Sequence, residues 1–248
     1  MGNMNPDRET VEVVWLGQVD YRAGWDLQNR LAAQIAAGMR APIMLLLEHP
    51  HTYTIGRRGG RDHLVWDEQQ RAQAGVEVVE VDRGGDITYH GPGQLVGYPL
   101  LRLAVPGWQG DRLPQADFVG YVRRLEEVLI RILAKFDIQA ERCTGLTGVW
   151  VPADSASNRP GKIASIGVKV DARGVSRHGF ALNVEPEMGY WQGIVACGLE
   201  GVRMVSMADL ISPVPPIAQV VQQTAQAFGD VFGVDLVWKD NLGGEGIA

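Results

Sequence analysis

The chain has 248 residues, a hydrophobic content of 46%, a charged content of 21% and a net charge of −6. This length and composition are typical of one ordinary globular α/β domain with a substantial core. The negative charge argues against nucleic acid as a partner, because the surface as a whole would repel a polyanion.

Membrane and export signals are lacking. The longest apolar runs, such as residues 43–47, are far too short to cross a bilayer, and the N-terminus has no basic segment followed by a hydrophobic one. We therefore expect no membrane partner. The two cysteines, Cys143 and Cys197, give no disulfide framework and fit a reducing compartment, so the sequence predicts a cytoplasmic protein.

Hydrophobic periodicity predicts alternating strands and helices in a single domain spanning 1–248, with a core at about 10–238 and a loose tail at 239–248. No internal repeat or low-complexity linker divides the chain. In chain order we expect a strand at 11–17, a helix at 21–39, strands at 41–50 and 76–82, a helix at 118–136, strands at 146–152, 162–170 and 178–184, a helix at 216–232 and a strand at 234–238.

The segment 83–100, "RGGDITYHGPGQLVGYPL", combines glycines, aromatic residues and polar side chains. Its pattern predicts a hairpin of two strands joined by a tight turn at "GPG". The glycines let the backbone approach a ligand closely, and the absence of a phosphate-loop or dinucleotide pattern argues against phosphate binding. A purely structural hairpin is the alternative. Strand alternation puts Asp86, Thr88 and His90 on one face and Ile87 and Tyr89 on the other.

Cys197 and Lys162 are the candidate reactive pair. Cys197 lies in "IVACGLEG", where a cysteine is either a small buried hydrophobe or a nucleophile. A nucleophilic thiolate needs a cation or base, and Lys162, which heads the apolar strand "KIASIGVKV", is the candidate. Lys162 either extends from the strand end towards water or is buried, and burial of an ammonium group disfavours its charged form. We take Cys143 as structural.

Other constellations are weaker. His178 and a nearby asparagine suggest a papain-like Cys-His-Asn arrangement, but the local signature of that family is absent. His49 and His51 lie close together, but no further ligand set accompanies them, so we expect no metal. The densest basic cluster lies in "TIGRRGGRD", which is either a solvated loop or a docking point for an acidic partner or a phosphorylated cofactor arm. Its members are Arg57, Arg58 and Arg61.

Six segments together resemble the lipoyl(octanoyl) transferase family, and they occur in family order over roughly residues 10–215. They are "EHPHTYTIGRRG", "RGGDITYHGPGQLVGYPL", "TGVWV", "GKIASIGVKV", "HGFALNV" and "ACGLEG". The second segment is the family's signature. The chain departs from the family pattern at His51, where proline is usual, and in the longer polar insertion 152–160.

The resemblance implies a mixed β-sheet packed with helices, similar to the catalytic domain of biotin and lipoate protein ligases. It implies that Cys197 is the acyl-accepting nucleophile and Lys162 its partner. Such a lysine could serve as base first for the cysteine and then for the acceptor amine. By the same resemblance, the acyl-substrate pocket is lined by Arg83, Gly84, Gly85, Asp86, Ile87, Thr88, Tyr89, His90, Ser165, Ile166, Gly167, Gly179, Phe180 and Ala181.

The activity that the resemblance implies is transfer of an octanoyl group from acyl carrier protein to a lysine of a lipoyl domain, in protein lipoylation. The expected acceptors are the lipoyl domains of 2-oxoacid dehydrogenase complexes and the H protein of the glycine cleavage system. No cofactor is needed, because the donor thioester is already activated. An ATP-dependent lipoate or biotin ligase, a thioesterase and a non-catalytic acyl-binding protein remain alternatives.

Overall fold

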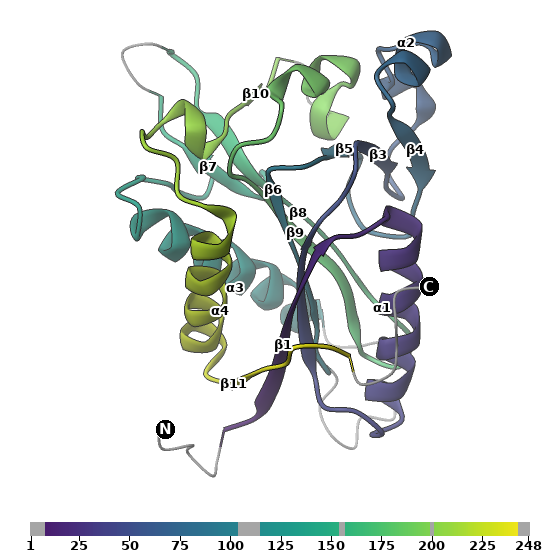
Figure 1. Ribbon diagram of the computed structural model, residues 1–248, viewed down its shortest axis with the longest axis vertical. Coiled ribbons are helices and arrows are strands. Elements are labelled where there is room, and N and C mark those ends of the chain that lie inside the picture. The colour runs from purple at the N-terminus through teal and green to yellow at the C-terminus, as the bar shows by residue number, and fades with distance from the viewer. Residues whose placement is uncertain (1–7, 104–114, 154–156, 199–200, 243–248) are drawn as a thin grey trace.

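The computed structural model describes residues 8–103, 115–153, 157–198 and 201–242, with residues 115–117 as backbone only. A large mixed β-sheet stands between helices α3 and α4 on one face and helix α1 on the other (Figure 1). The prediction of a mixed sheet packed with helices is therefore confirmed. The helices are α1 (Tyr21–Ala36), α2 (Glu68–Gln73), α3 (Gln115–Ala134) and α4 (Ile217–Phe232).

The large sheet has eight strands, and its order mixes parallel and antiparallel neighbours. Its strands, from one edge to the other, are β10 (Arg203–Met204), β8 (Gly161–Val170), β9 (Ser176–Asn183), β6 (Gln94–Leu100), β2 (Ile43–Glu48), β1 (Thr10–Gln18) and β11 (Asp235–Trp238), and β7 (Val149–Val151) pairs with β8. The smaller sheet has the order β4 (Glu77–Glu80), β3 (Thr52–Ile55) and β5 (Ile87–His90). Short 3₁₀ turns are η1 (Arg61–His63), η2 (Met188–Gly193), η3 (Ala196–Gly198) and η4 (Met207–Asp209).

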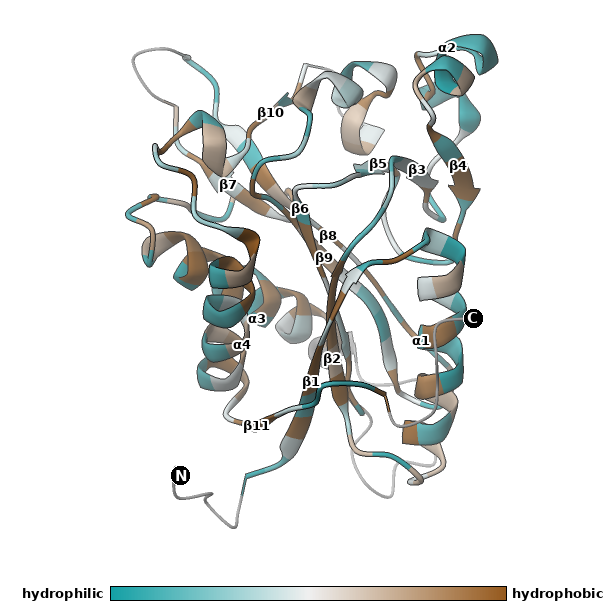
Figure 2. Cartoon of the chain, viewed as in Figure 1, coloured by the Kyte–Doolittle hydropathy of each residue, from teal (hydrophilic) through white to brown (hydrophobic). Residues whose placement is uncertain are grey.

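Two hydrophobic cores lie on the two faces of the large sheet. One core packs α3 and α4 against the sheet through buried residues such as Leu125, Leu129 and Phe228. The other packs α1 through Leu27 and Leu31, which lie four residues apart and so share one face of the helix. The strands in the middle of the sheet are largely hydrophobic along their length (Figure 2), as expected for strands covered on both faces.

The predicted hairpin at 83–100 is wrong. Strand β5 pairs with β3 in the small sheet, whereas β6 lies between β2 and β9 in the large one. The expected tight turn is present, because the Gln94 amide donates to the carbonyl of Gly91 at 3.1 Å. Gly93 in this turn has a φ of 83°, and a Cβ atom there would collide with the Glu185 carbonyl. The turn therefore passes the chain from one sheet to the other.

The tail that was predicted to be loose begins at 239. Within its described part, residues 239–241 are exposed, whereas Leu242 is 6% exposed and packs in the same hydrophobic core as α1. Residues 243–248 and 154–156 of the polar insertion lie outside the described residues.

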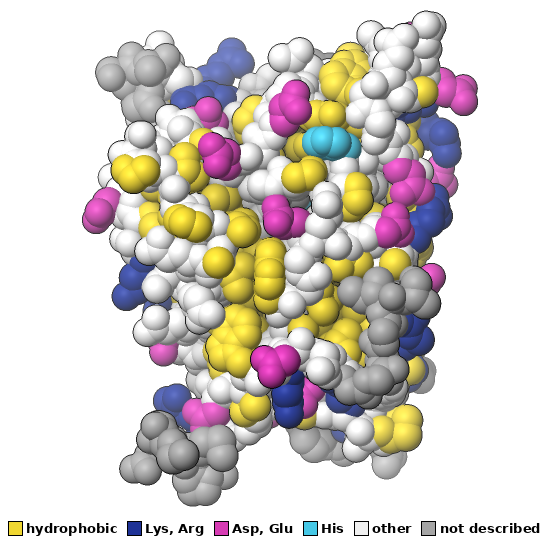
Figure 3. All heavy atoms as spheres, viewed as in Figure 1, with side chains coloured by type: hydrophobic (Ala, Val, Ile, Leu, Met, Phe, Trp, Pro, Cys, Tyr) yellow, Lys and Arg dark blue, Asp and Glu magenta, His cyan; other side chains and the backbone are white. Residues whose placement is uncertain are grey.

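No helix in the described part of the chain is long and apolar enough to span a membrane. On the face in Figure 3, charged side chains of both signs surround hydrophobic ones without forming a broad basic patch.

Candidate active site

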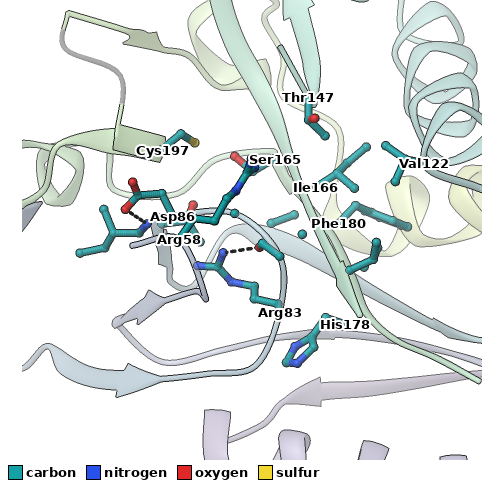
Figure 4. Close-up of a pocket in the computed structure, with 18 of the residues that line it drawn as sticks. Arg58, Arg83, Asp86, Val122, Thr147, Ser165, Ile166, His178, Phe180 and Cys197 are labelled. Carbon is teal, nitrogen blue, oxygen red and sulfur yellow. Dashed lines mark hydrogen bonds between the residues drawn. The ribbon is translucent and has the colours of Figure 1, made fainter. Parts of the chain in front are cut away.

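A cavity of about 580 Å³ opens where the segment before β5 meets β8 and β9. The Gly84 amide donates to the Val168 carbonyl at 2.9 Å and so joins the two walls. In Figure 4, Cys197, Asp86 and Arg58 lie on one side of this space, and Val122, Ile166 and Phe180 lie on the other. The volume is within the usual range of small-molecule sites.

The cavity wall contains Lys162, Cys197 and every residue predicted to line the acyl pocket except Tyr89. Tyr89 points the other way, because strand alternation sends it into the small-sheet core, where its ring stacks on Tyr190 with centroids 5.2 Å apart. The cavity also contains residues that sequence reasoning did not assign to it. These are Tyr21, Arg58, Tyr98, Val122, Gly145, Leu146, Thr147, Val168 and His178.

The thiol of Cys197 lies beside the amine of Lys162. The Nζ atom of Lys162 donates to the Sγ atom of Cys197 at 3.1 Å. Lys162 is 4% exposed, so of the two placements predicted for it the buried one is correct, and its Nζ lies 5.3 Å from the centre of the Trp150 ring. Gly148 leaves room for this side chain, since a Cβ atom there would lie 2.8 Å from its Cε atom.

Cys197 adopts a backbone conformation that non-glycine residues rarely adopt. Its φ is 59° and its ψ is 18°, in the left-handed region, within the 3₁₀ turn η3. Gly198, which follows it, has a φ of 65°. Left-handed geometry at a non-glycine residue is uncommon and tends to occur at functional sites. The other cysteine, Cys143, is free, partly exposed and absent from the cavity wall.

Arg83 gives the cavity a buried positive charge. Its Nη2 atom donates to the carbonyl and hydroxyl oxygens of Thr54 at 2.6 and 2.8 Å, and its Nη1 atom donates to the Gly84 carbonyl at 3.1 Å. These acceptors are neutral, and burial lowers the pKa of Arg83 from its ordinary value. Among the described residues, neutral oxygens thus hold the guanidinium in place, and it forms no ion pair with a carboxylate there.

Asp82 lies at the centre of a network of charged and polar side chains. Its carboxylate accepts from Lys169 at 2.5 Å, from Arg177 at 2.6 Å and from the Nε2 atom of His178 at 2.8 Å. Burial alone would raise the pKa of this carboxyl, but the three hydrogen bonds hold the pKa well below its usual range. Asp82 therefore holds in place the part of β9 that contains His178, and His178 lies in the cavity wall.

Two of the three buried histidines, His49 and His90, are neutral near pH 7. Burial lowers the pKa of His49 to about 4 and the pKa of His90 well below its ordinary value. His49 bonds the Val19 carbonyl and the Tyr98 hydroxyl, each at 2.7 Å. Within the described residues, no three His, Cys, Asp or Glu side chains are grouped as metal ligands.

The arginines of the basic cluster are distributed rather than joined in one patch. Arg58 lies in the cavity wall, Arg57 is exposed, and Arg61 donates to Glu80 at 2.9 Å across an exposed surface. Exposed ion pairs of this kind contribute little to stability.

The geometry defines a class of site: a thiol in contact with a buried lysine, at the wall of a cavity of small-molecule size, can support nucleophilic catalysis. A profile of the lipoyl protein ligase A/B catalytic domain matches residues 20–229. An octanoyltransferase of Chloroflexus aurantiacus is 42% identical over 226 residues, or 91% of this chain and 96% of the relative. One of Acidobacterium capsulatum is 40% identical over 236 residues, or 94% of each chain. The chain therefore belongs to the lipoyl protein ligase A/B catalytic-domain family and, within it, to the octanoyltransferases.

Solved structures with a similar fold include a bipartite lipoate protein ligase of Thermoplasma acidophilum. It has a TM-score of 0.68 at 16% identity and covers 94% of this chain and 88% of its own. A lipoate-protein ligase A bound with ATP has a TM-score of 0.65 at 14% identity and covers 95% and 90%. At these identities the likeness concerns the fold alone.

Proposed function

We propose that the chain transfers an octanoyl group from acyl carrier protein to a lysine of a lipoyl domain, with Cys197 carrying the group as a thioester. The observation that supports this most is the 3.1 Å contact between Lys162 and Cys197 in the wall of the cavity. Two free cysteines fit a reducing compartment such as the cytoplasm.

In the first half-reaction the Cys197 thiolate attacks the carbonyl carbon of the donor thioester. The bond from that carbon to the carrier's sulfur breaks, and the Lys162 ammonium gives its proton to the departing thiolate. The products are acyl-Cys197, a neutral Lys162 and the free thiol of the carrier. Exchange of one thioester for another is nearly isoenergetic, so this step needs no ATP.

In the second half-reaction the amine of the acceptor lysine attacks the acyl-Cys197 carbonyl. An amide bond forms, the carbon–sulfur bond breaks, and Lys162 takes a proton from the attacking nitrogen. The thiolate of Cys197 and the ammonium of Lys162 are then restored as a pair. Formation of an amide from a thioester is favourable and drives the reaction.

The acyl chain fits the apolar side of the cavity, which includes Val122, Ile166 and Phe180. Burial of about six methylenes at ~0.8 kcal/mol each supplies roughly 5 kcal/mol for binding the octanoyl chain. We propose as acceptors the lipoyl domains of 2-oxoacid dehydrogenase complexes and the H protein of glycine cleavage.

Incubation of the purified chain with octanoyl-acyl carrier protein and a lipoyl domain, without ATP, tests this function. We expect the lipoyl domain to gain one octanoyl mass, on its target lysine. Octanoate with ATP should give no product, which separates this function from that of an ATP-dependent ligase. Release of free octanoate in place of the amide would identify a thioesterase and contradict the proposal.

A further inference from the structure

A histidine and an aspartate form a hydrogen-bonded pair beside η3, the turn that contains Cys197. The Nδ1 atom of His63, in η1, lies 2.8 Å from the Oδ1 atom of Asp86. The same carboxylate oxygen accepts from the Ile87 amide at 2.6 Å, so Asp86 is held by its own backbone. This second contact fixes the carboxylate, and the carboxylate fixes the plane of the imidazole ring.

The pair is attached to the turn that carries the thiol. The Val195 amide donates to the His63 carbonyl at 2.9 Å. A Cβ atom at Gly198 would collide with the Asp86 carboxylate and would lie 3.2 Å from the Cε1 atom of His63. The imidazole and the carboxylate therefore pack directly against the residue that follows Cys197.

His63 differs from the other histidines of the chain in the direction in which its pKa is shifted. Its side chain is 28% exposed, and the hydrogen bond to Asp86 raises its pKa above the ordinary value. Burial lowers the pKa of His49, His51, His90 and His178. His63 is thus the histidine whose protonated form its surroundings favour, and its side chain is partly open to solvent.

In the proposed second half-reaction, one of the two protons that the acceptor lysine loses has no assigned acceptor. A lysine amine with a reference pKa of about 10.4 arrives as an ammonium and loses two protons on becoming an amide. Lys162 takes one of them when the thiolate–ammonium pair is restored. The other proton must leave before attack, because an ammonium group has no lone pair.

We propose that His63, oriented by Asp86, is the catalytic base that takes this first proton from the acceptor lysine. This inference rests on the proposed function. The neutral imidazole donates its Nδ1 proton to Asp86, which leaves the Nε2 lone pair available. The acceptor ammonium gives one proton to Nε2, and the amine then attacks acyl-Cys197. Lys162 takes the second proton as the carbon–sulfur bond breaks, and His63 returns its own to solvent.

The sign of the pH dependence follows from this role. His63 must be neutral to accept a proton, so transfer is full above its pKa and falls as the pH drops through it. Asp62 adds to the effect of Asp86, since both negative charges favour the protonated ring. The charged groups that act on the His63 ring are Asp86 and Asp62, and the cavity wall that includes Asp86 also contains Arg58, Lys162 and Cys197.

The test separates the two half-reactions in the full chain. His63→Gln keeps a hydrogen-bond donor for Asp86 but has no basic nitrogen. His51→Gln is the matched control, since His51 is also partly buried and also bonded through Nδ1, to the Tyr89 hydroxyl at 2.8 Å. Loading with octanoyl-carrier protein and single-turnover transfer to a lipoyl domain are followed by intact mass between pH 5.5 and 9, a window chosen around the ordinary pKa of histidine, about 6.5.

We expect His63→Gln to load within about threefold of the unmodified chain and to transfer roughly 10²–10⁴-fold more slowly at pH 7. In His63→Gln, the plot of transfer rate against pH should no longer change slope near the histidine pKa. In His51→Gln, that change of slope should remain. Hydroxylamine, which is neutral at pH 7 and needs no base, should remove the octanoyl group from both variants at the unmodified rate. Unchanged lysine transfer, or equal losses in loading, transfer and hydroxylamine cleavage, would overturn the role of His63. Failure of the unmodified chain to load would instead contradict the proposed function.

Discussion

The Nζ atom of Lys162 and the Sγ atom of Cys197 lie 3.1 Å apart, although 35 positions separate the two residues in the chain. The pairing of β10 with β8 brings them together. Met204 is the register partner of Lys162, and the Val205 amide donates to the Lys162 carbonyl at 3.0 Å. The segment that follows the cysteine turn is therefore bound to the strand that carries the lysine.

Lys162→Arg should separate the charge of the lysine from its ability to lose a proton. Arginine keeps the positive charge beside Cys197 but stays protonated in proteins, so it cannot take a proton from the attacking amine. We expect alkylation of Cys197 at pH 7 to continue at a similar rate in Lys162→Arg and to slow in Lys162→Ala. Single-turnover transfer from the preloaded acyl-enzyme should fall by about 10²–10⁴-fold in both. Transfer at the unmodified rate in Lys162→Arg would make the lysine a charge partner only.

Val122→Trp should shorten the acyl chain that the cavity accepts. Val122 lies on α3 at the apolar side of the cavity, and a larger ring there fills space that we assign to the end of the chain. Displacing about four methylenes costs roughly 3 kcal/mol, or about 100-fold in kcat/KM for an octanoyl donor. The same substitution at Val119, which is 57% exposed on the same helix, is the control.

A butyryl donor should be much less affected by Val122→Trp, and equal losses with both donors would indicate a general defect.

Gly85 is a poorer position for this test, even though it lies in the cavity wall. Its φ is 88°, so any side chain would strain the backbone before it obstructed the cavity.

Asp82→Asn should destabilise the fold in a pH-dependent manner. The folded-state pKa of Asp82 is depressed, so its stabilising effect is present above the unfolded pKa, about 4, and is lost as the pH falls below it. At pH 7 we expect a loss of roughly 1–3 kcal/mol, less than for a fully buried pair because the side chain is 29% exposed. Urea unfolding of both chains at pH 7 and pH 3 measures this, and a difference that does not shrink at pH 3 would contradict it.

The sequence patterns marked Lys162 and Cys197 as candidates but left the role of each open, and the prediction that they form a reactive pair came from the resemblance to a family. Lys162 stands at the head of an apolar strand, and Cys197 stands between an apolar run and glycines. The main strands and the three long helices were also predicted, since hydrophobic periodicity reflects burial on one or both faces of an element.

Pairing between strands was harder to predict than the strands themselves. The tight turn at "GPG" indicated a hairpin, but β5 and β6 each find other partners, and a local turn pattern carries no information about which strands are neighbours. The contact between His63 and Asp86 was missed for the same reason. Nothing in "GRDHLV" distinguishes this histidine, because its partner Asp86, 2.8 Å away, is 23 positions further along the chain.

The mass of the intact chain after incubation with octanoyl-acyl carrier protein tests the covalent role of Cys197 most directly. We expect a gain of one octanoyl group that hydroxylamine removes, retained in Cys143→Ala and absent in Cys197→Ala and Cys197→Ser. The Cys143→Ala variant is the matched control, because that cysteine is also free and partly exposed but lies outside the cavity. An octanoyl adduct that persists without Cys197 would contradict the account.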